Sequence, residues 1–243
     1  MNINNFFNID ERLMQLDEKI LAEISPRFKE TDDITEYNQL KMLSAFIKNG
    51  VTESAFAGST GYGYDDRGRE ILERVMADAM GAEDSLIRHN FVSGTHTLTV
   101  ALFGLLRPGD KVLVLTGRPY DTITGVFGID EKTDGSLADF GVEYHEIALL
   151  PDGTPDKAAI KKELAANTYK MAYIQRSRGY STRPSLTIEK IRELCDIVRE
   201  TSPKSIIMVD NCYGEFTEKQ EPCEVGADII AGSLIKNPGG GIA

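Results

Sequence analysis

Two residues with chemically useful side chains each follow a short apolar run in the C-terminal part of the sequence. Asp210 comes directly after residues 206–209, and Lys236 follows the run 228–235 and precedes a proline and three glycines. In an open parallel sheet, ligands bind at the carboxyl ends of the strands. A lysine that forms a Schiff base and an aspartate that pairs with a pyridine nitrogen are the two fixed points of pyridoxal phosphate. Strands that end in Asp or Lys are common, so the hypothesis needs support from elsewhere in the chain.

A Ser-Gly-Thr turn provides the first support. Ser93, Gly94 and Thr95 follow a short segment at 86–88, which we expect to be a strand, and precede an apolar helix expected over 98–106. Free backbone N–H groups and the dipole at a helix N-terminus favour a bound phosphate. So short a motif also arises by chance, and its place between strand and helix is what favours a phosphate site. There is no GxGxxG motif, so a dinucleotide site is not supported.

The loop at 57–69 is a second candidate for anion binding. It is rich in glycine, and its Tyr62, Tyr64 and Arg67 carry hydroxyl and guanidinium donors that suit an anion. An ordinary connection ahead of an amphipathic helix over 70–80 would have a similar composition. Local sequence leaves both interpretations open.

The amino-acid composition excludes several classes of protein. A chain of 243 residues with 41% hydrophobic and 27% charged residues can bury a sizeable core. The net charge of −11 argues against nucleic acid or an anionic membrane surface as a main partner. No apolar run approaches the ~18 residues of a membrane span, and the first ten residues lack the form of a signal peptide, so we expect a cytoplasmic protein. Cys195, Cys212 and Cys223 form no CxxC pair, so neither disulfides nor a metal site is predicted.

The order of apolar patterns predicts an α/β fold. Strands are expected at 111–115, 142–147, 171–175, 206–210 and 229–233, with helices at 155–166 and 188–200. This alternation predicts a mostly parallel sheet with helices on both faces. Residues 1–50 show two helical patterns separated at Pro26 and cannot close a core alone. We therefore expect an N-terminal helical arm over 1–50, packed on the remainder or on a second subunit, and a large domain over 51–243.

Taken together, these motifs resemble those of a known protein family. SGTH at 93–96, Tyr120, VDN at 209–211 and GSLIK at 232–236 resemble, in order, the landmarks of fold-type I pyridoxal-phosphate enzymes of the cystathionine and methionine lyase group. The longer runs GYGYDDRGRE, VSGTH, TGRPYDT, IQRSRGYSTRPSLTI, VDNCYGEF and AGSLIKNPGGG resemble the aluminum-resistance proteins, a methionine gamma-lyase-like branch. The similarity extends from about residue 10 to the last residue.

The resemblance implies a role for each candidate residue. Lys236 would carry the cofactor and act as general base for the substrate's α-proton, Asp210 would keep the ring nitrogen protonated, and Tyr120 would stack on the ring. The phosphate would be held by Ser93, Gly94, Thr95 and Ser233, and by Tyr64 and Arg67 of a neighbouring subunit. The spacing of that last pair departs from the family pattern. A hydroxyl residue common one position before the lysine is Ile235 here, which removes one phosphate contact.

The implied activity is that of a carbon–sulfur lyase, which removes the α-proton of a sulfur-containing amino acid and eliminates a β or γ group. An aminotransferase on the same scaffold and a non-catalytic protein linked to aluminum resistance stay open, because the cofactor landmarks do not fix the reaction. The arm and the loop at 57–69 imply a homo-oligomer, at least a dimer with a tetramer favoured. Proteins of this type usually continue after the lysine with another strand and a C-terminal domain, so we expect this chain to be a fragment.

Overall fold

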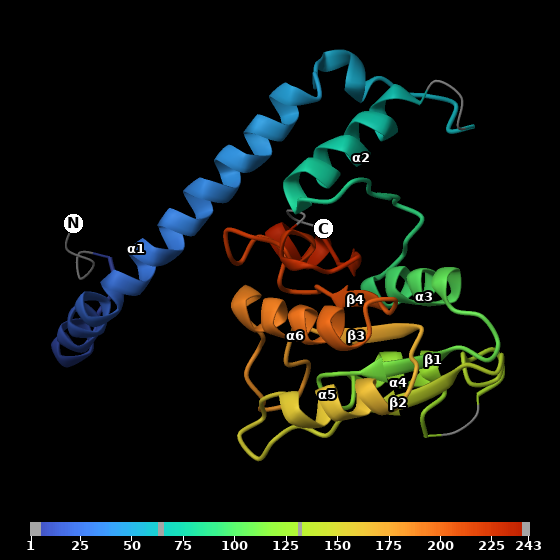
Figure 1. The fold of residues 1–243 in the computed structure, drawn as a ribbon. Coiled ribbons are helices and arrows are strands. Elements are labelled where there is room, and N and C mark those ends of the chain that lie inside the picture. The colour runs from blue at the N-terminus through green and yellow to red at the C-terminus, as the bar shows by residue number, and fades with distance from the viewer. Residues whose placement is uncertain (1–5, 63–65, 131–132, 240–243) are drawn as a thin grey trace.

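A computed structural model describes residues 6–62, 66–130 and 133–239 (Figure 1). The α-helices are α1 Glu11–Lys48, α2 Arg67–Met80, α3 Gly94–Leu105, α4 Asp121–Phe127, α5 Lys157–Ala166 and α6 Ile188–Thr201. The strands are β1 Lys111–Val114, β2 Glu143–Glu146, β3 Met171–Gln175, β4 Ile206–Asp210 and β5 Ile229–Ala231. The turns η2 Glu53–Phe56 and η3 Pro222–Val225 are 3-10 helical, and η4 Ile235–Gly239 is an irregular π-helical turn. None of the described helices is long and apolar enough to cross a membrane.

The strands form one parallel sheet in the order β2-β1-β3-β4-β5 (Figure 1). Gln175 at the end of β3 pairs in register with Asp210 at the end of β4, which pairs in turn with Ala231 at the end of β5. The carboxyl ends of these three strands therefore coincide. The predicted α/β fold with a parallel sheet is confirmed.

Successive strand residues point to opposite faces of the sheet, and each face has its own helices. Leu113 and Ile174 pack in one apolar cluster with residues of α5 and α6. Val114 and Tyr173 pack in the other cluster with residues of α3 and α4. Both faces are covered, as the sequence predicted. This burial holds the strand ends in fixed positions.

The N-terminal segment forms one helix rather than the two that we predicted. α1 continues through Pro26. A proline removes one backbone hydrogen bond and bends a helix, but the turns on either side can continue it. The C-terminal part of α1 packs on α2 through Ala45, Ile71 and Val75, while the N-terminal part extends away from the sheet (Figure 1). That part exposes the side chains of Leu13, Leu16, Ile20, Leu21, Ile24 and Phe28.

Two local predictions differ from the structure, and one helix was not predicted. Residues 86–88 form no strand, because this segment lies outside the sheet and Arg88 instead pairs with Glu73 of α2. The segment after β1, which we did not predict to be helical, leads into α4. β5 ends at Ala231 rather than at 233, so Lys236 lies on η4 and does not follow a strand directly.

Candidate functional site

Asp210 lies buried at the carboxyl edge of the sheet, where β4 ends. Its Oδ1 accepts a 3.1 Å hydrogen bond from the Cys212 N–H, and its Oδ2 accepts one of 3.3 Å from the Tyr173 hydroxyl. Burial raises the pKa of Asp210, because water no longer stabilises the ionised carboxyl group. Hydrogen bonds from the backbone and side chain of Cys212 and from Tyr173, and the charge of Lys236, act in the opposite direction. A further cation beside this carboxyl would favour its charged form. The protonated nitrogen of a pyridine ring is such a cation.

Lys236 lies on η4, close to the loop that follows β4. Its backbone N–H donates a 2.9 Å hydrogen bond to the Ser233 carbonyl. Its Nζ lies 4.2 Å from the centre of the Tyr213 ring, within the range of a cation–π contact. Its charge also acts on the Asp210 carboxyl group, so the amine and the carboxyl group belong to the same site. The sequence interpretation did not single out Tyr213, although its position in VDNCYGEF was an available signal.

The Ser-Gly-Thr turn opens α3, close to where the sequence predicted a helix start. Ser93 is the N-cap, and its hydroxyl accepts a 3.1 Å hydrogen bond from the His96 N–H. Gly94 is buried, and an added Cβ there would lie 3.1 Å from Cys212 Sγ and 3.4 Å from Ser233 Cβ. The turn, the loop after β4 and the segment after β5 therefore converge so closely that a side chain at Gly94 would require Cys212 to shift by a few tenths of an ångström.

Tyr120 lies beside this turn. Its hydroxyl is 3.1 Å from the Thr95 hydroxyl, which is also 3.0 Å from the hydroxyl of Thr122. The Tyr120 backbone N–H donates a 2.9 Å hydrogen bond to the Gln175 side chain at the end of β3. These contacts hold Tyr120 between the helix N-terminus and the carboxyl edge of the sheet.

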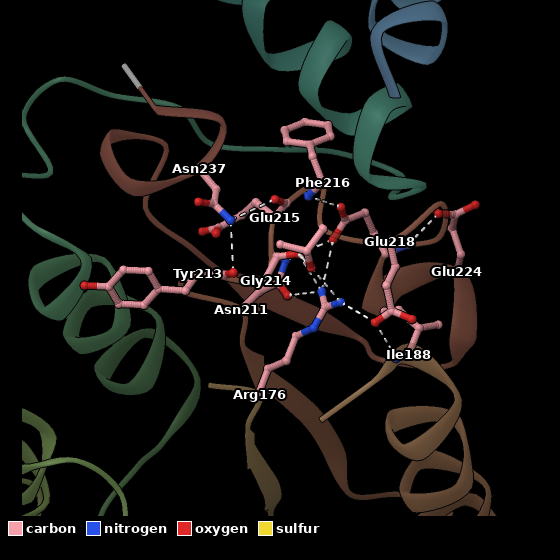
Figure 2. A network of polar contacts seen from close by, with 12 residues as sticks. Arg176, Ile188, Asn211, Tyr213, Gly214, Glu215, Phe216, Glu218, Glu224 and Asn237 are labelled. Atoms are coloured by element: carbon pink, nitrogen blue, oxygen red, sulfur yellow. Dashed lines mark hydrogen bonds and ion pairs between the residues drawn. The ribbon is translucent and has the colours of Figure 1, made fainter. Parts of the chain in front are cut away.

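Arg176, a buried residue that the sequence interpretation did not single out, organises the loop after β4 (Figure 2). Its Nη1 donates hydrogen bonds of 2.8 Å to the Asn211 side chain and to the Gly214 carbonyl, and its Nη2 donates one of 2.8 Å to Glu218. The fully buried Glu221 lies 3.7 Å from Nη1. Because Arg176 and Glu221 are both removed from water, separating them would leave a buried charge uncompensated. The loop is thereby held in one arrangement.

Arg183 is a second buried arginine that the sequence interpretation did not single out. Its Nη2 donates hydrogen bonds to the carbonyls of Gln175, at 3.2 Å, and Ser177, at 2.5 Å. Its Nη1 is buried without a hydrogen-bond partner among the described residues. Burial lowers the pKa of Arg183, and the nearby Asp210 carboxylate partly offsets this effect. An oxyanion would satisfy the free donor.

Pyridoxal phosphate fits this set of groups. The cofactor presents an anionic phosphate, a phenolate oxygen and a ring nitrogen that can carry a proton. The site offers a helix N-terminus at Gly94, an unpartnered buried donor on Arg183 and a buried carboxyl group on Asp210. Lys236 supplies the amine that the aldehyde of the cofactor requires.

Of the remaining predicted site residues, Tyr64 and Arg67, the structure describes only Arg67. Tyr64 lies outside the described residues. Arg67 is exposed at the first residue of α2, and no hydrogen bond within the described part of the chain joins it to the site. Ile235, where the family more often has a hydroxyl residue, is exposed on η4. A role for Tyr64 and Arg67 at a neighbouring subunit stays a prediction.

Comparisons with known proteins identify relatives. A family model described as methionine gamma-lyase matches residues 13–243. The uncharacterized protein YnbB of Bacillus subtilis is 46% identical over 226 residues, which cover 93% of this chain and 53% of YnbB. A Listeria innocua crystal structure, described as a candidate cystathionine beta-lyase involved in aluminum resistance, is 52% identical with a TM-score of 0.91 and covers 97% of this chain and 57% of that one. The Escherichia coli protein YhfS, described as pyridoxal-phosphate dependent, is 19% identical with a TM-score of 0.62 over 81% of this chain and 50% of that one, which shows the fold alone.

The chain thus spans about half the length of these relatives. The Listeria structure confirms both the fold-type I architecture and the resemblance to the aluminum-resistance branch. The family match extends from α1 through the turn that carries Lys236. This chain belongs to the methionine gamma-lyase family of pyridoxal-phosphate-dependent enzymes.

Proposed function

We propose that the protein is a pyridoxal-phosphate-dependent carbon–sulfur lyase that acts on a sulfur-containing amino acid. The observation that carries the proposal is the buried Asp210 carboxyl group at the carboxyl edge of the sheet, which lies within range of the charge of Lys236 on η4. The family match and the description of the Listeria relative support the lyase class. The reaction would remove the α-proton of the substrate and release a sulfur-bearing group from its β or γ carbon.

The roles of the residues follow from their surroundings. Bound pyridoxal phosphate supplies a ring that accepts electrons from the α-carbon of the substrate. Asp210 would keep the ring nitrogen protonated, because a buried carboxylate is stabilised by a cation beside it. The neutral amine of Lys236 would take the α-proton, and the Tyr213 ring, 4.2 Å from Nζ, limits where this amine can lie.

The phosphate group would lie at the N-terminus of α3. Ser93, Gly94 and Thr95 offer backbone N–H groups there, and Ser233 lies against Gly94 on the facing segment. The Tyr120 hydroxyl forms a hydrogen bond with the Thr95 hydroxyl, and the Tyr120 ring would cover the cofactor. Together these residues would hold the phosphate end of the cofactor at the start of α3, beside Tyr120.

The same proposal includes the assembly and surroundings of the protein. The exposed apolar side chains of α1 support a homo-oligomer, at least a dimer with a tetramer favoured. The net charge of −11 supports a small-molecule substrate rather than nucleic acid or an anionic membrane. The proposal also includes an N-terminal arm of residues 1–50, a large domain of residues 51–243 and a cytoplasmic location.

Product analysis tests the reaction class. Protein loaded with pyridoxal phosphate is incubated with sulfur-containing amino acids in the absence of a keto-acid acceptor. A lyase releases ammonia, a keto acid and the sulfur-bearing group in equal amounts. Heat-unfolded protein with the same amount of cofactor measures the reaction that the free cofactor catalyses alone. Accumulation of pyridoxamine phosphate would instead indicate an aminotransferase, and a folded protein that forms no product would contradict the proposal.

A further inference from the structure

Glu215 is a buried carboxyl group to which the mechanism above gives no role. It lies in the loop after β4 and is only 3% exposed. Its Oε1 accepts a 2.5 Å hydrogen bond from the Ser233 N–H. Its Oε2 is buried and has no hydrogen-bond partner among the described residues. A buried carboxyl group in contact with the segment that carries Lys236 requires a physical reason.

A glycine makes room for this carboxyl group. An added Cβ on Gly232 would lie 2.4 Å from Oε1 and 3.2 Å from the side-chain carbon Cδ of Glu215. Atoms at 2.4 Å overlap, so any other residue at this position would displace the carboxyl group. Gly232 therefore allows Glu215 to lie directly against the backbone that leads from β5 to the lysine.

Glu215 also contacts the other end of this segment. The Asn237 side chain donates hydrogen bonds to the backbone carbonyls of Glu215, at 3.2 Å, and Tyr213, at 2.9 Å (Figure 2). Lys236 lies between Ser233 and Asn237 in the chain. The backbone on both sides of the lysine is thus held by the loop after β4.

We propose that Glu215 is a positioning residue for Lys236. Its side chain fixes the start of the lysine-bearing turn through Ser233, and its backbone helps to fix the end through Asn237. The amine of Lys236 is then directed to one place, over the Tyr213 ring. The inference rests on the proposed function only in taking this amine as the group that reacts with the cofactor.

The charges around Glu215 give the inference a second, independent signature. The charges of Glu221 and Asp210 act on Glu215, and Glu215 in turn acts on Cys212. Lys236 acts on Asp210 and Cys212, and Arg176 lies 3.7 Å from Glu221. Burial, reinforced by the negative charges of Glu221 and Asp210, raises the pKa of Glu215 from 4.5 to about 7. The folded protein therefore keeps a proton that the unfolded chain loses above about pH 4.5. Its contribution makes the folded state less stable as pH rises from about 4.5 to about 7, with no further change above that range.

The test compares Glu215→Met, which removes the acceptor of the Ser233 N–H, with Glu215→Gln, which keeps an acceptor oxygen. In the cofactor-free proteins, the rate of Lys236 acetylation is measured by peptide mass, with the exposed Lys204 as internal reference. Loss of one hydrogen bond of this kind should change the rate by about tenfold. We expect faster acetylation of Lys236 in Glu215→Met and a rate within about twofold of wild type in Glu215→Gln.

Thermal unfolding between pH 4 and 8 supplies the second measurement. Both Glu215 variants should lack the loss of stability between about pH 4.5 and 7 that wild type shows. Glu83→Gln, which changes an exposed carboxyl group, should keep it. If Glu215→Met does not fold, Gly232→Ala displaces the same carboxyl group and takes its place in the acetylation assay.

Unchanged Lys236 acetylation in folded Glu215→Met or Gly232→Ala would overturn the inference. Borohydride trapping of added pyridoxal phosphate on wild type separates this result from a failure of the proposed function. A wild-type protein that traps no cofactor would contradict the proposed function, while the acetylation rates, which need no cofactor, would still decide the role of Glu215. Slower cofactor trapping in Glu215→Met than in Glu215→Gln would support both.

Discussion

Two regions of the molecule differ in what they expose to water. They are the carboxyl edge of strands β3, β4 and β5, and the N-terminal part of α1. At the edge, charged side chains are buried, and Arg176 and Asp210 find hydrogen-bond partners within this chain. In the N-terminal part of α1, apolar side chains are exposed, with Leu13 at 60% and Phe28 at 51%. The edge of the sheet buries polar groups, whereas the N-terminal part of α1 leaves apolar groups exposed to water.

This difference indicates which contacts this chain makes by itself and which surface a second subunit would cover. At the edge, Arg176 and Asp210 are held by contacts between strands and loops of this chain. Burying an exposed leucine stabilises an assembly by about 1.5–3 kcal/mol, so the arm would gain from a second subunit. The four predictions below test the edge first and the arm afterwards.

The largest effect is expected at Arg176. Arg176→Met keeps much of the side-chain volume but leaves the buried Glu221 without its cation, which should lower the free energy of unfolding by about 3–5 kcal/mol. Urea denaturation measures this loss. The exposed Arg178→Met serves as control. Equal stability of the two variants would show that the loop does not depend on the buried pair.

Asp210→Asn should slow turnover by about 100- to 1000-fold while the protein stays folded and keeps its cofactor, because the ring nitrogen loses its anionic partner. The rate of α-proton exchange with deuterated water, followed by NMR, isolates this step from later ones. Asp196→Asn, a change at an exposed carboxylate of α6, should have no effect. A normal exchange rate in Asp210→Asn would remove Asp210 from the mechanism.

Leu16→Lys tests the arm. Leu16 is 51% exposed in the isolated chain, and a charge at this position should weaken an assembly that buries it by about 1.5–3 kcal/mol. Light scattering at micromolar concentration should show a shift toward smaller species. The control is Gln15→Lys, which introduces the same charge at the neighbouring residue, an exposed polar one. A wild-type protein that is already a stable monomer would contradict the proposed role of the arm.

The smallest effect is expected where α1 meets α2. The Lys48 ammonium, followed by the Asn49 side chain, lowers the pKa of Asp78 below 3.8 by hydrogen bonding. Asp78→Asn should cost about 0.2–1 kcal/mol at neutral pH, because the pair is partly exposed. A carboxyl group whose pKa is depressed by folding contributes its full stability above the unfolded pKa of 3.8 and loses this contribution as pH falls from there through the folded pKa, so the cost of Asp78→Asn should shrink below pH 3.8. Thermal unfolding at pH 7 and pH 3 measures the difference, and equal losses at both would exclude the ion pair as the cause.

The sheet was predictable because its signals are local. The four apolar residues before Asp210 and the buried run of β3 specify strands by their own composition, and the helices between them require parallel pairing. The end of β5 was not predictable from the apolar run 228–235 alone. The last register pair between β4 and β5 joins Asp210 to Ala231, and β5 ends there although Leu234 and Ile235 follow.

The groups that the sequence interpretation missed depend on contacts between distant segments. Arg176 meets Asn211, 35 residues later, and Glu215 meets Ser233, 18 residues later. These neighbours exist only once the sheet has formed, and no spacing along the chain indicates them. Asp210 and Lys236 were predicted because their residue types and their apolar flanks suffice to suggest their chemistry.

The central claim is that Lys236 is the residue that reacts with pyridoxal phosphate beside Asp210. The most direct measurement is peptide mapping by mass spectrometry after the protein has been incubated with the cofactor and reduced with borohydride. We predict one cofactor-derived group on the peptide that contains Lys236, lost in Lys236→Ala and kept in Lys204→Ala, a change at an exposed lysine. Attachment to a different lysine, or no attachment to a folded protein, would contradict the claim.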